Sequence, residues 1–254
     1  MEWDAPAIVL AARAHGENDA IATVMTEAHG VHRGLARGGT GRAGAALWQA
    51  GNLVQVRWVG RLAEQLGNFS AEMVHPAAAL AMDDKLALAM LSAACAVAES
   101  ALPERAPHPA VFDGLLHLLA RLPRGAEMLA EYVRWECAVL RELGFALDLS
   151  ACAVTGATAG LAFVSPRSGR AVTMEGAGAF AARLLRLPGF LVGGNIAEAA
   201  DWRDGLALTG HFLARDAFGQ LHRPLPPARR MLYDRVAALL DESGPDESGT
   251  HDAG

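Results

Sequence analysis

The sequence has little lysine, little cysteine and no long uninterrupted apolar run, and each shortage excludes a class of protein. Lys85 is the only lysine among 22 basic residues, so arginine carries nearly all of the positive charge. The three cysteines, Cys95, Cys137 and Cys152, cannot all pair, which excludes a disulfide scaffold and predicts reduced thiols in the cytoplasm. Charged residues interrupt the most apolar run, Ala77–Ala98, and the remainder is too short to cross a bilayer.

The composition is that of a folded, soluble protein without a membrane partner. The first ten residues, MEWDAPAIVL, lack the basic start of a signal peptide. The 254 residues are 52% hydrophobic and 20% charged. This composition excludes disordered, collagen-like and coiled-coil chains, and it suffices for the core of one large domain or two small ones.

The net charge of −6 hides a strongly basic segment. Residues 241–254 contain five acids and no lysine or arginine, so the rest of the chain carries only −1. The segment Val31–Leu62 has no acid and contains five arginines, which are Arg33, Arg37, Arg42, Arg57 and Arg61. Arginine pairs with phosphate in a bidentate manner, although a GC-rich coding bias also replaces lysine by arginine. A nucleic-acid binder is therefore compatible with the acidic total.

The first 76 residues predict five short strands separated by turn sequences and by a glycine-rich loop at Gly38–Gly44. The predicted strands are Ala7–Arg13, Ala20–Thr26, Val31–Arg37, Leu53–Val59 and Phe69–Val74. Five short strands with a long break between the third and the fourth are typical of a closed Greek-key barrel of the OB-fold type. Because side chains alternate along a strand, we expect Arg33, Arg37 and Arg57 to point outward and Trp58 to lie in the core.

The rest of the chain predicts a mainly helical domain. The helical segments are Ala77–Ala101, Val111–Leu122, Ala126–Leu143, Gly178–Leu187, Ala197–Ala214 and Pro227–Leu240. Residues 147–174 predict a small β-hairpin with strands Leu161–Val164 and Ala171–Thr173. The expected fold class is thus α+β, with an OB-fold barrel at 1–76, a helical domain with an inserted hairpin at 77–240 and a disordered acidic tail at 241–254.

No motif assembles a catalytic site. Gly39–Gly44 matches G-x-G-x-x-G, but a dinucleotide-binding unit needs a full crossover helix after the glycines, and only residues 45–50 precede the next turn. We interpret this segment as a flexible loop that carries Arg42. The chain shows no set of nucleophile, base and orienting group, and no Walker lysine loop. We expect a binding protein without a cofactor, not an enzyme.

A second basic site lies at the start of the last predicted helix. Arg229 and Arg230 follow Pro226 and Pro227, and proline is tolerated in the first turn of a helix. Two cations at this position oppose the helix dipole. Either an anionic partner such as phosphate binds them, or both are solvated, and we include both among the candidate DNA-binding residues.

Five short segments carry a resemblance to a known family: Ala14–Asp19, Glu27–Gly38, Gln49–Val54, Leu62–Gly67 and His222–Pro226. In this order and spacing, they resemble the RecO family of bacterial DNA repair proteins. The resemblance implies an N-terminal OB-fold, a helical C-terminal domain and no bond chemistry. It implies binding to single- and double-stranded DNA and annealing of complementary strands, in the cytoplasm and at the nucleoid.

The resemblance also implies partners and site residues. The partners are RecR, the C-terminal tail of single-stranded DNA-binding protein and, by function, RecF and RecA, which RecO proteins help to load onto coated DNA. Arg33 and Arg37 occupy basic positions of the family's barrel, whereas Arg42, Arg57 and Arg61 come from the charge pattern and the strand faces.

One segment departs from the family pattern. Many RecO relatives hold zinc near the hairpin through two Cys-x-x-Cys pairs. Here Cys152-Ala153-Val154-Thr155 keeps a single cysteine, and none follows near residues 171–175. Since zinc takes about four nitrogen or sulfur ligands, we predict a hairpin without metal, held by packing.

Two other functions stay open on the sequence alone. An OB-fold adaptor would bind proteins without binding DNA, and a gel shift with a single-stranded oligonucleotide distinguishes it. A hydrolase or nucleotide-dependent enzyme would be revealed by ATPase and nuclease assays.

Overall fold

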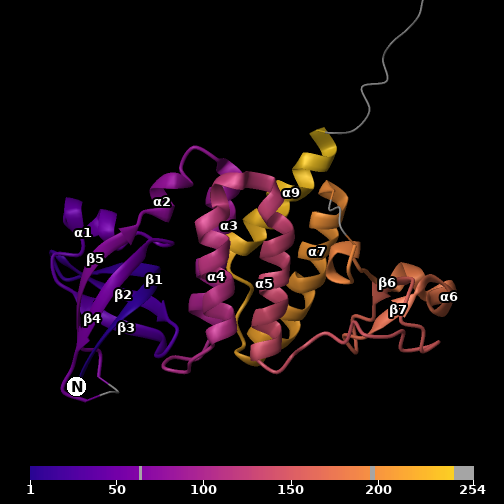
Figure 1. The fold of residues 1–254 in the computed structure, drawn as a ribbon, viewed down its shortest axis with the longest axis horizontal. Coiled ribbons are helices and arrows are strands. Elements are labelled where there is room, and N and C mark those ends of the chain that lie inside the picture. Colours follow the sequence, from indigo (N-terminus) through magenta and orange to yellow (C-terminus); the bar gives the residue numbers. More distant parts are fainter. Residues whose placement is uncertain (63–64, 195–197, 243–254) are drawn as a thin grey trace, which may run out of the picture.

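The computed structural model describes residues 1–62, 65–194 and 198–242, and the predicted acidic tail from residue 243 on lies outside the described residues. The structure is α+β, with strands first and helices after them, as predicted. Figure 1 shows a barrel at one end, helices in the middle and a small second sheet at the other end. None of the described helices is both long enough and apolar enough to span a membrane.

The five N-terminal strands close into a barrel in the order β1-β2-β3-β5-β4. Their bounds are β1 Glu2–His15, β2 Asp19–Thr26, β3 Gly30–Ala36, β4 Leu53–Val59 and β5 Asn68–His75, which confirms the five predicted strands. Neighbours are antiparallel except β3 and β5, which run parallel and pair only at Leu35 with Asn68 and at Ala36 with Phe69. The short helix α1, Arg42–Leu47, lies between β3 and β4 in the sequence.

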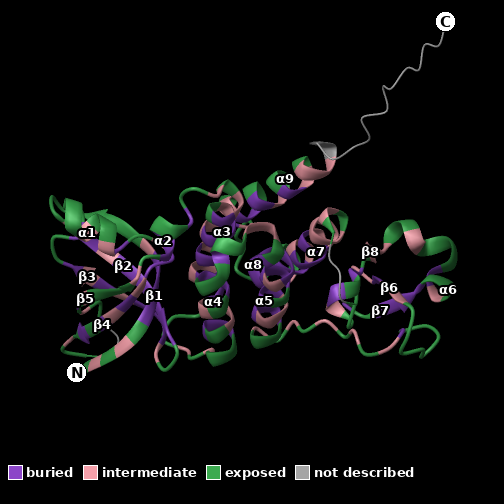
Figure 2. Ribbon diagram, turned by 45° about the horizontal axis from the view of Figure 1, so that its top comes forward, coloured by how far each residue is buried: buried purple, intermediate pink, exposed green. Residues whose placement is uncertain are grey.

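Alternate residues of the barrel strands face two different cores. Inward residues such as Val56 and Trp58 are buried inside the barrel, as predicted for Trp58. Outward residues such as Ile8, Met25 and Val31 are buried too, because they belong to the core that the helices form. Figure 2 shows this junction between barrel and helices. One outer face of the barrel is therefore covered, and a ligand has access only to the remainder.

The helical part consists of α2 Ala77–Leu80, α3 Lys85–Ala101, α4 Pro109–Arg121, α5 Leu129–Glu142, α7 Ala199–Phe212 and α9 Pro227–Glu242, with short turns α6 Met174–Ala177 and α8 Phe218–Gln220. The single helix predicted over residues 77–101 is in fact two. Asp84 caps the second one, since its carboxylate accepts the backbone N–H groups of Leu86 at 2.7 Å and Ala87 at 3.1 Å.

The insertion between α5 and α7 contains a three-stranded sheet and not the predicted two-stranded hairpin. Strands β6 Leu161–Val164 and β7 Ala171–Thr173 form where predicted, but β8 Leu185–Arg186 pairs with the other edge of β6. The helix predicted over residues 178–187 is wrong. Gly178 has a φ of 46°, residues 178–183 form only a 3-10 turn, and the Arg186 guanidinium lies 5.3 Å from the ring centre of Phe163 in β6.

A buried ion pair joins α5 to α9. Arg229 is 1% exposed, and its Nε and Nη2 donate to the Glu136 carboxylate at 2.5 Å and 2.8 Å. The hydroxyls of Tyr132 and Thr209 donate to the same carboxylate at 3.0 Å and 2.5 Å. Arg229 Nη2 also donates to the carbonyl of Leu206 at 2.8 Å. These bonds connect α5, α7 and α9 through one polar group in the core.

The assignment of Arg229 to DNA binding is therefore wrong. The cation at the start of α9 does have an anionic partner, but that partner is the Glu136 carboxylate of the same chain. Burial acts to lower the pKa of Arg229, but the charge interactions and hydrogen bonds with Glu136 and Tyr132 together outweigh it, so the pKa lies above its ordinary value. Arg230, the next residue, is exposed.

We expect Arg229→Met to lower the free energy of unfolding by about 3–5 kcal/mol, because it leaves the Glu136 carboxylate buried without its cation. The matched control Arg230→Met should change it by less than about 0.5 kcal/mol. The double variant Arg229→Met/Glu136→Leu should regain most of the loss, since no charge is left buried. Denaturant unfolding measures all three, and similar small effects in both single variants would contradict the buried pair.

Candidate nucleic-acid interface

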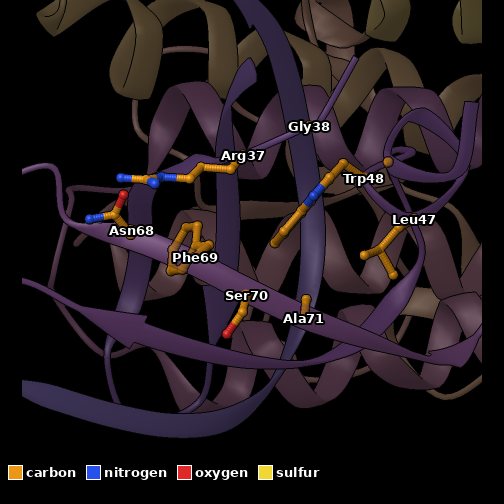
Figure 3. Close-up of a pocket in the computed structure, with 9 residues that line it drawn as sticks. Arg37, Gly38, Leu47, Trp48, Asn68, Phe69, Ser70 and Ala71 are labelled. Carbon is orange, nitrogen blue, oxygen red and sulfur yellow. The ribbon is translucent and has the colours of Figure 1, made fainter. Parts of the chain in front are cut away.

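The short contact between β3 and β5 leaves a groove in the barrel wall. Beyond Ala36 and Phe69 the two strands no longer pair, and α1 packs near β5 at this opening. The groove has a volume of about 530 Å³. Figure 3 shows Arg37 and Asn68 towards one end of it, and Trp48 and Leu47 towards the other.

The floor of this groove is aromatic and its rim is polar. The rings of Trp48 and Phe69 are stacked with centroids 5.9 Å apart, and both residues are buried. Arg37, Asn68 and Ser70 are exposed around them. An extended chain with negative charges and flat rings therefore finds a cation and an apolar surface side by side here.

The glycine-rich segment serves close packing. A Cβ on Gly44 would lie 2.2 Å from the carbonyl oxygen of Gly38, and one on Gly39 would lie 2.7 Å from the Cβ of Ala20. The backbone N–H of Gly38 donates to the Asp19 carboxylate at 2.8 Å. The glycines thus hold α1 against the barrel. Arg42 was expected in a loop, but it is the first residue of α1.

The five arginines of the basic segment differ in their surroundings. Arg37, Arg42 and Arg61 are exposed, and none of them forms an ion pair with a residue that the structure describes. Arg33 is half-buried, with its Nε 3.1 Å from the Glu104 carboxylate. Arg57 is exposed, but its Nε and Nη2 lie 2.8 Å and 2.7 Å from Glu2 Oε1.

The positions of Arg33 and Arg57 explain their ion pairs. Arg33 lies on the outward face of β3 that runs into the junction with the helices, where Glu104 follows α3. Arg57 lies on the β1–β4 face, in register with Asp4, and the adjacent Gln55 donates to the Asp4 carboxylate. The basic segment therefore does not present five equivalent charges, and only Arg37, Arg42 and Arg61 have no ion pair with a residue that the structure describes.

Arg230 belongs to a different surface. It lines a cavity of about 340 Å³ between α7 and α9, together with Leu206, Leu225 and Tyr233. The structure thus separates it from the barrel arginines. Glu2 and Glu104 were not predicted as charge partners, because both lie outside the basic segment. Trp48 and Phe69 were also missed, although Phe69 begins a predicted strand.

The donor set around Cys152 does not fit zinc. The Cys152 Sγ accepts the backbone N–H groups of Thr155 at 3.4 Å and Thr173 at 3.3 Å, and Thr173 Oγ1 lies 3.5 Å away. Burial acts to raise the pKa of this thiol, but hydrogen bonds from the two threonines outweigh it and lower the pKa to about 6. Within the described residues no three histidine, cysteine or acidic side chains cluster to hold a metal.

Known proteins of one family resemble this chain along nearly its whole length. The family model "Recombination protein O N terminal" matches residues 1–77, and "Recombination protein O C terminal" matches residues 82–224. The DNA repair protein RecO of Granulibacter bethesdensis is 55% identical over 244 residues, which cover 95% of this chain and 98% of the relative. That of Acidiphilium cryptum is 57% identical over 245 residues, covering 95% and 98%.

We expect Gly44→Ala to displace α1 and to lower the free energy of unfolding by about 1–3 kcal/mol, because the new methyl group has no room against Gly38. Gly41→Ala is the matched control, since its Cβ would approach the same carbonyl only to 3.3 Å and its φ of −63° suits alanine. Thermal unfolding compares the two variants. Equal stability would show that the close packing of α1 is not needed.

We expect the purified protein to contain far less than one zinc per chain, and EDTA to leave its melting temperature unchanged. Cys152→Ala should lower that temperature, because the N–H groups of Thr155 and Thr173 lose their acceptor. Cys137→Ala serves as the control on α5. Elemental analysis and thermal unfolding measure both expectations. One zinc per chain would contradict a metal-free site at Cys152.

Proposed function

From the premise that this chain belongs to the RecO family, whose members act in DNA repair, we propose that it binds single- and double-stranded DNA on its barrel and anneals complementary strands. The observation that carries the proposal is the groove between β3 and β5, with Arg37 on its rim and Arg42 on the adjoining α1. The strand order and the parallel β3–β5 pair support an OB-fold for this barrel. We place its boundary near residue 76, with the helical domain at 77–240.

The proposed contacts are mainly electrostatic. Arg37, Arg42 and Arg61 neutralise phosphates and release the counterions condensed on DNA, which gives affinity without sequence preference. Arg33 and Arg57 contribute less, because Glu104 and Glu2 already neutralise them and repel an approaching phosphate. Two strands held with reduced repulsion pair by themselves, so annealing needs neither ATP nor any bond chemistry.

The helical domain is proposed as the platform for protein partners. The cavity between α7 and α9 has an apolar lining from Leu206, Leu225 and Tyr233 and carries Arg230 at its side. Such a cavity suits the tail of another protein, and we propose the C-terminal tail of single-stranded DNA-binding protein as its occupant. In this scheme the protein acts with RecR and RecF, and it helps to load RecA onto coated DNA at the nucleoid.

The salt dependence of single-stranded DNA binding tests the electrostatic proposal. With three phosphate contacts, log K against log salt should have a slope near −2, about −0.7 for each contact. Arg37→Ala/Arg42→Ala should flatten the slope by about 1.4 and slow annealing, since two contacts are lost. Arg33→Ala/Arg57→Ala is the matched control with the same change in net charge, and its slope should stay close to that of the wild type.

Two outcomes would contradict the proposal. If both double variants flatten the slope equally, the ion pairs do not decide which arginines bind. If the wild type shows no gel shift with single-stranded DNA even at low salt, the chain is an adaptor that binds only proteins.

A further inference from the structure

A second cavity, of about 340 Å³, is lined in part by the first residues of the chain. The N-terminus lies at the end of the barrel away from α1 (Figure 1). The barrel and the segment after α3 build it together. Trp3 of β1, His29 of the β2–β3 turn and His32 of β3 line it, with Trp58 of β4 and Arg105. None of these residues was predicted to be a site residue, and Trp58 was expected to lie in the core.

The aromatic rings of this cavity form a row. The rings of His29 and Trp3 are stacked with centroids 4.3 Å apart and planes 19° apart, and Trp3 is nearly parallel to Trp58 at 6.0 Å. Trp58 is buried, whereas Trp3 and His29 are only half-buried. The row therefore begins in the barrel core and ends in rings that solvent reaches. Accessible aromatic rings of this kind are surfaces on which a base stacks.

His32 places a buried polar side chain at this cavity. It is 4% exposed, and neither Nδ1 nor Nε2 has a hydrogen-bond partner among the described residues. Its ring meets Trp3 edge to face at 5.2 Å and Trp58 at 5.0 Å. Burial, helped by Arg105 and His29, lowers the pKa of His32 to about 4. At neutral pH its ring thus offers one donor and one acceptor, the same pair that the edge of a nucleobase presents.

The segment around Arg105, which forms the wall opposite the strands, is held against β3 by backbone contacts. The N–H of Arg105 donates to the carbonyl of Val31 at 2.8 Å, and Arg105 has a φ of 63°, which is uncommon for a residue other than glycine. Gly30 allows this approach, because a Cβ there would lie 2.0 Å from the carbonyl of Ala106. An arginine is thereby fixed at the cavity. The carboxylate of Glu2, which also lines it, is paired with Arg57.

We propose that this cavity holds one unstacked nucleobase of bound single-stranded DNA. The base stacks on the Trp3–His29 pair, exchanges hydrogen bonds with His32, and places its phosphate near Arg105. This inference rests on the proposed DNA binding and adds a base contact to it. The phosphate contacts at α1 are indifferent to the bases, whereas this cavity requires a base to be present.

The test compares two oligonucleotides of equal length, oligo(dT) and one with abasic sites at every position, by fluorescence anisotropy with the full chain. The two carry the same phosphates. Base stacking is worth about 1–3 kcal/mol, so the wild type should bind oligo(dT) about five-fold more tightly or better. His29→Ala and Trp3→Leu should bring this ratio close to one and leave the affinity for the abasic strand unchanged.

Two controls and a third cavity variant make the result specific. His15→Ala removes an exposed histidine elsewhere on the barrel and should keep the ratio, whereas Arg37→Ala should weaken both oligonucleotides alike. His32→Phe keeps an aromatic ring without its nitrogens and should lower the ratio. Circular dichroism and thermal unfolding confirm that each variant is folded, and His29→Ala, at a half-buried turn position, tests the cavity if Trp3→Leu fails to fold.

The possible failures are distinguishable. A wild-type ratio near one overturns the base cavity and leaves phosphate binding intact, while no binding to either oligonucleotide overturns the proposed function itself. A ratio that survives in all three cavity variants places the base contact elsewhere and also overturns the inference. Free dTMP should compete only weakly, and if it binds more tightly than oligo(dT), the occupant is a mononucleotide and the proposal is wrong.

Discussion

The packing of one barrel face against the helices is the constraint on which the rest of the structure depends. Ile8, Leu10, Met25 and Val31 point out of the barrel and are buried in the helical core. Each is worth about 1.5–3 kcal/mol when fully buried, whereas an exposed ion pair such as Arg33 with Glu104 is worth about 0–1 kcal/mol. Apolar contact therefore fixes how the barrel sits, and the charges adapt to it.

The arginines differ in whether an acidic side chain of the same chain already pairs with them. Arg33 lies at the edge of the junction and pairs with Glu104, Arg57 pairs with Glu2, and Arg229 is enclosed with Glu136. Of the arginines in the basic segment, Arg37, Arg42 and Arg61 are exposed and form no ion pair with a described residue, and Arg37 lines the groove beside α1. A chain with a net charge of −6 can thus still carry a groove with exposed arginines at its rim.

The sequence predicts the barrel well because its strands obey the two-residue period, and it places Trp58 in the core for the same reason. Prediction from the sequence fails where a side chain pairs with a residue that is distant along the chain. The helix-dipole conflict at Arg229 correctly indicated an anion, but the anion is 93 residues away in the sequence. The two-residue strand β8 is too short to leave a periodic signal. An aspartate such as Asp84 is a typical helix N-cap, but the alanine-rich sequence around it hid the interruption between α2 and α3.

The proposed path of DNA runs along the groove beside α1, where Arg37 and Arg42 are exposed and form no ion pair with a described residue. Hydrogen–deuterium exchange with and without single-stranded DNA tests it most directly, because it reports on every peptide at once. We expect slower exchange in residues 37–47 and in the first half of β5 when DNA is bound. Slower exchange confined to α7 and α9, with the groove unchanged, would contradict it.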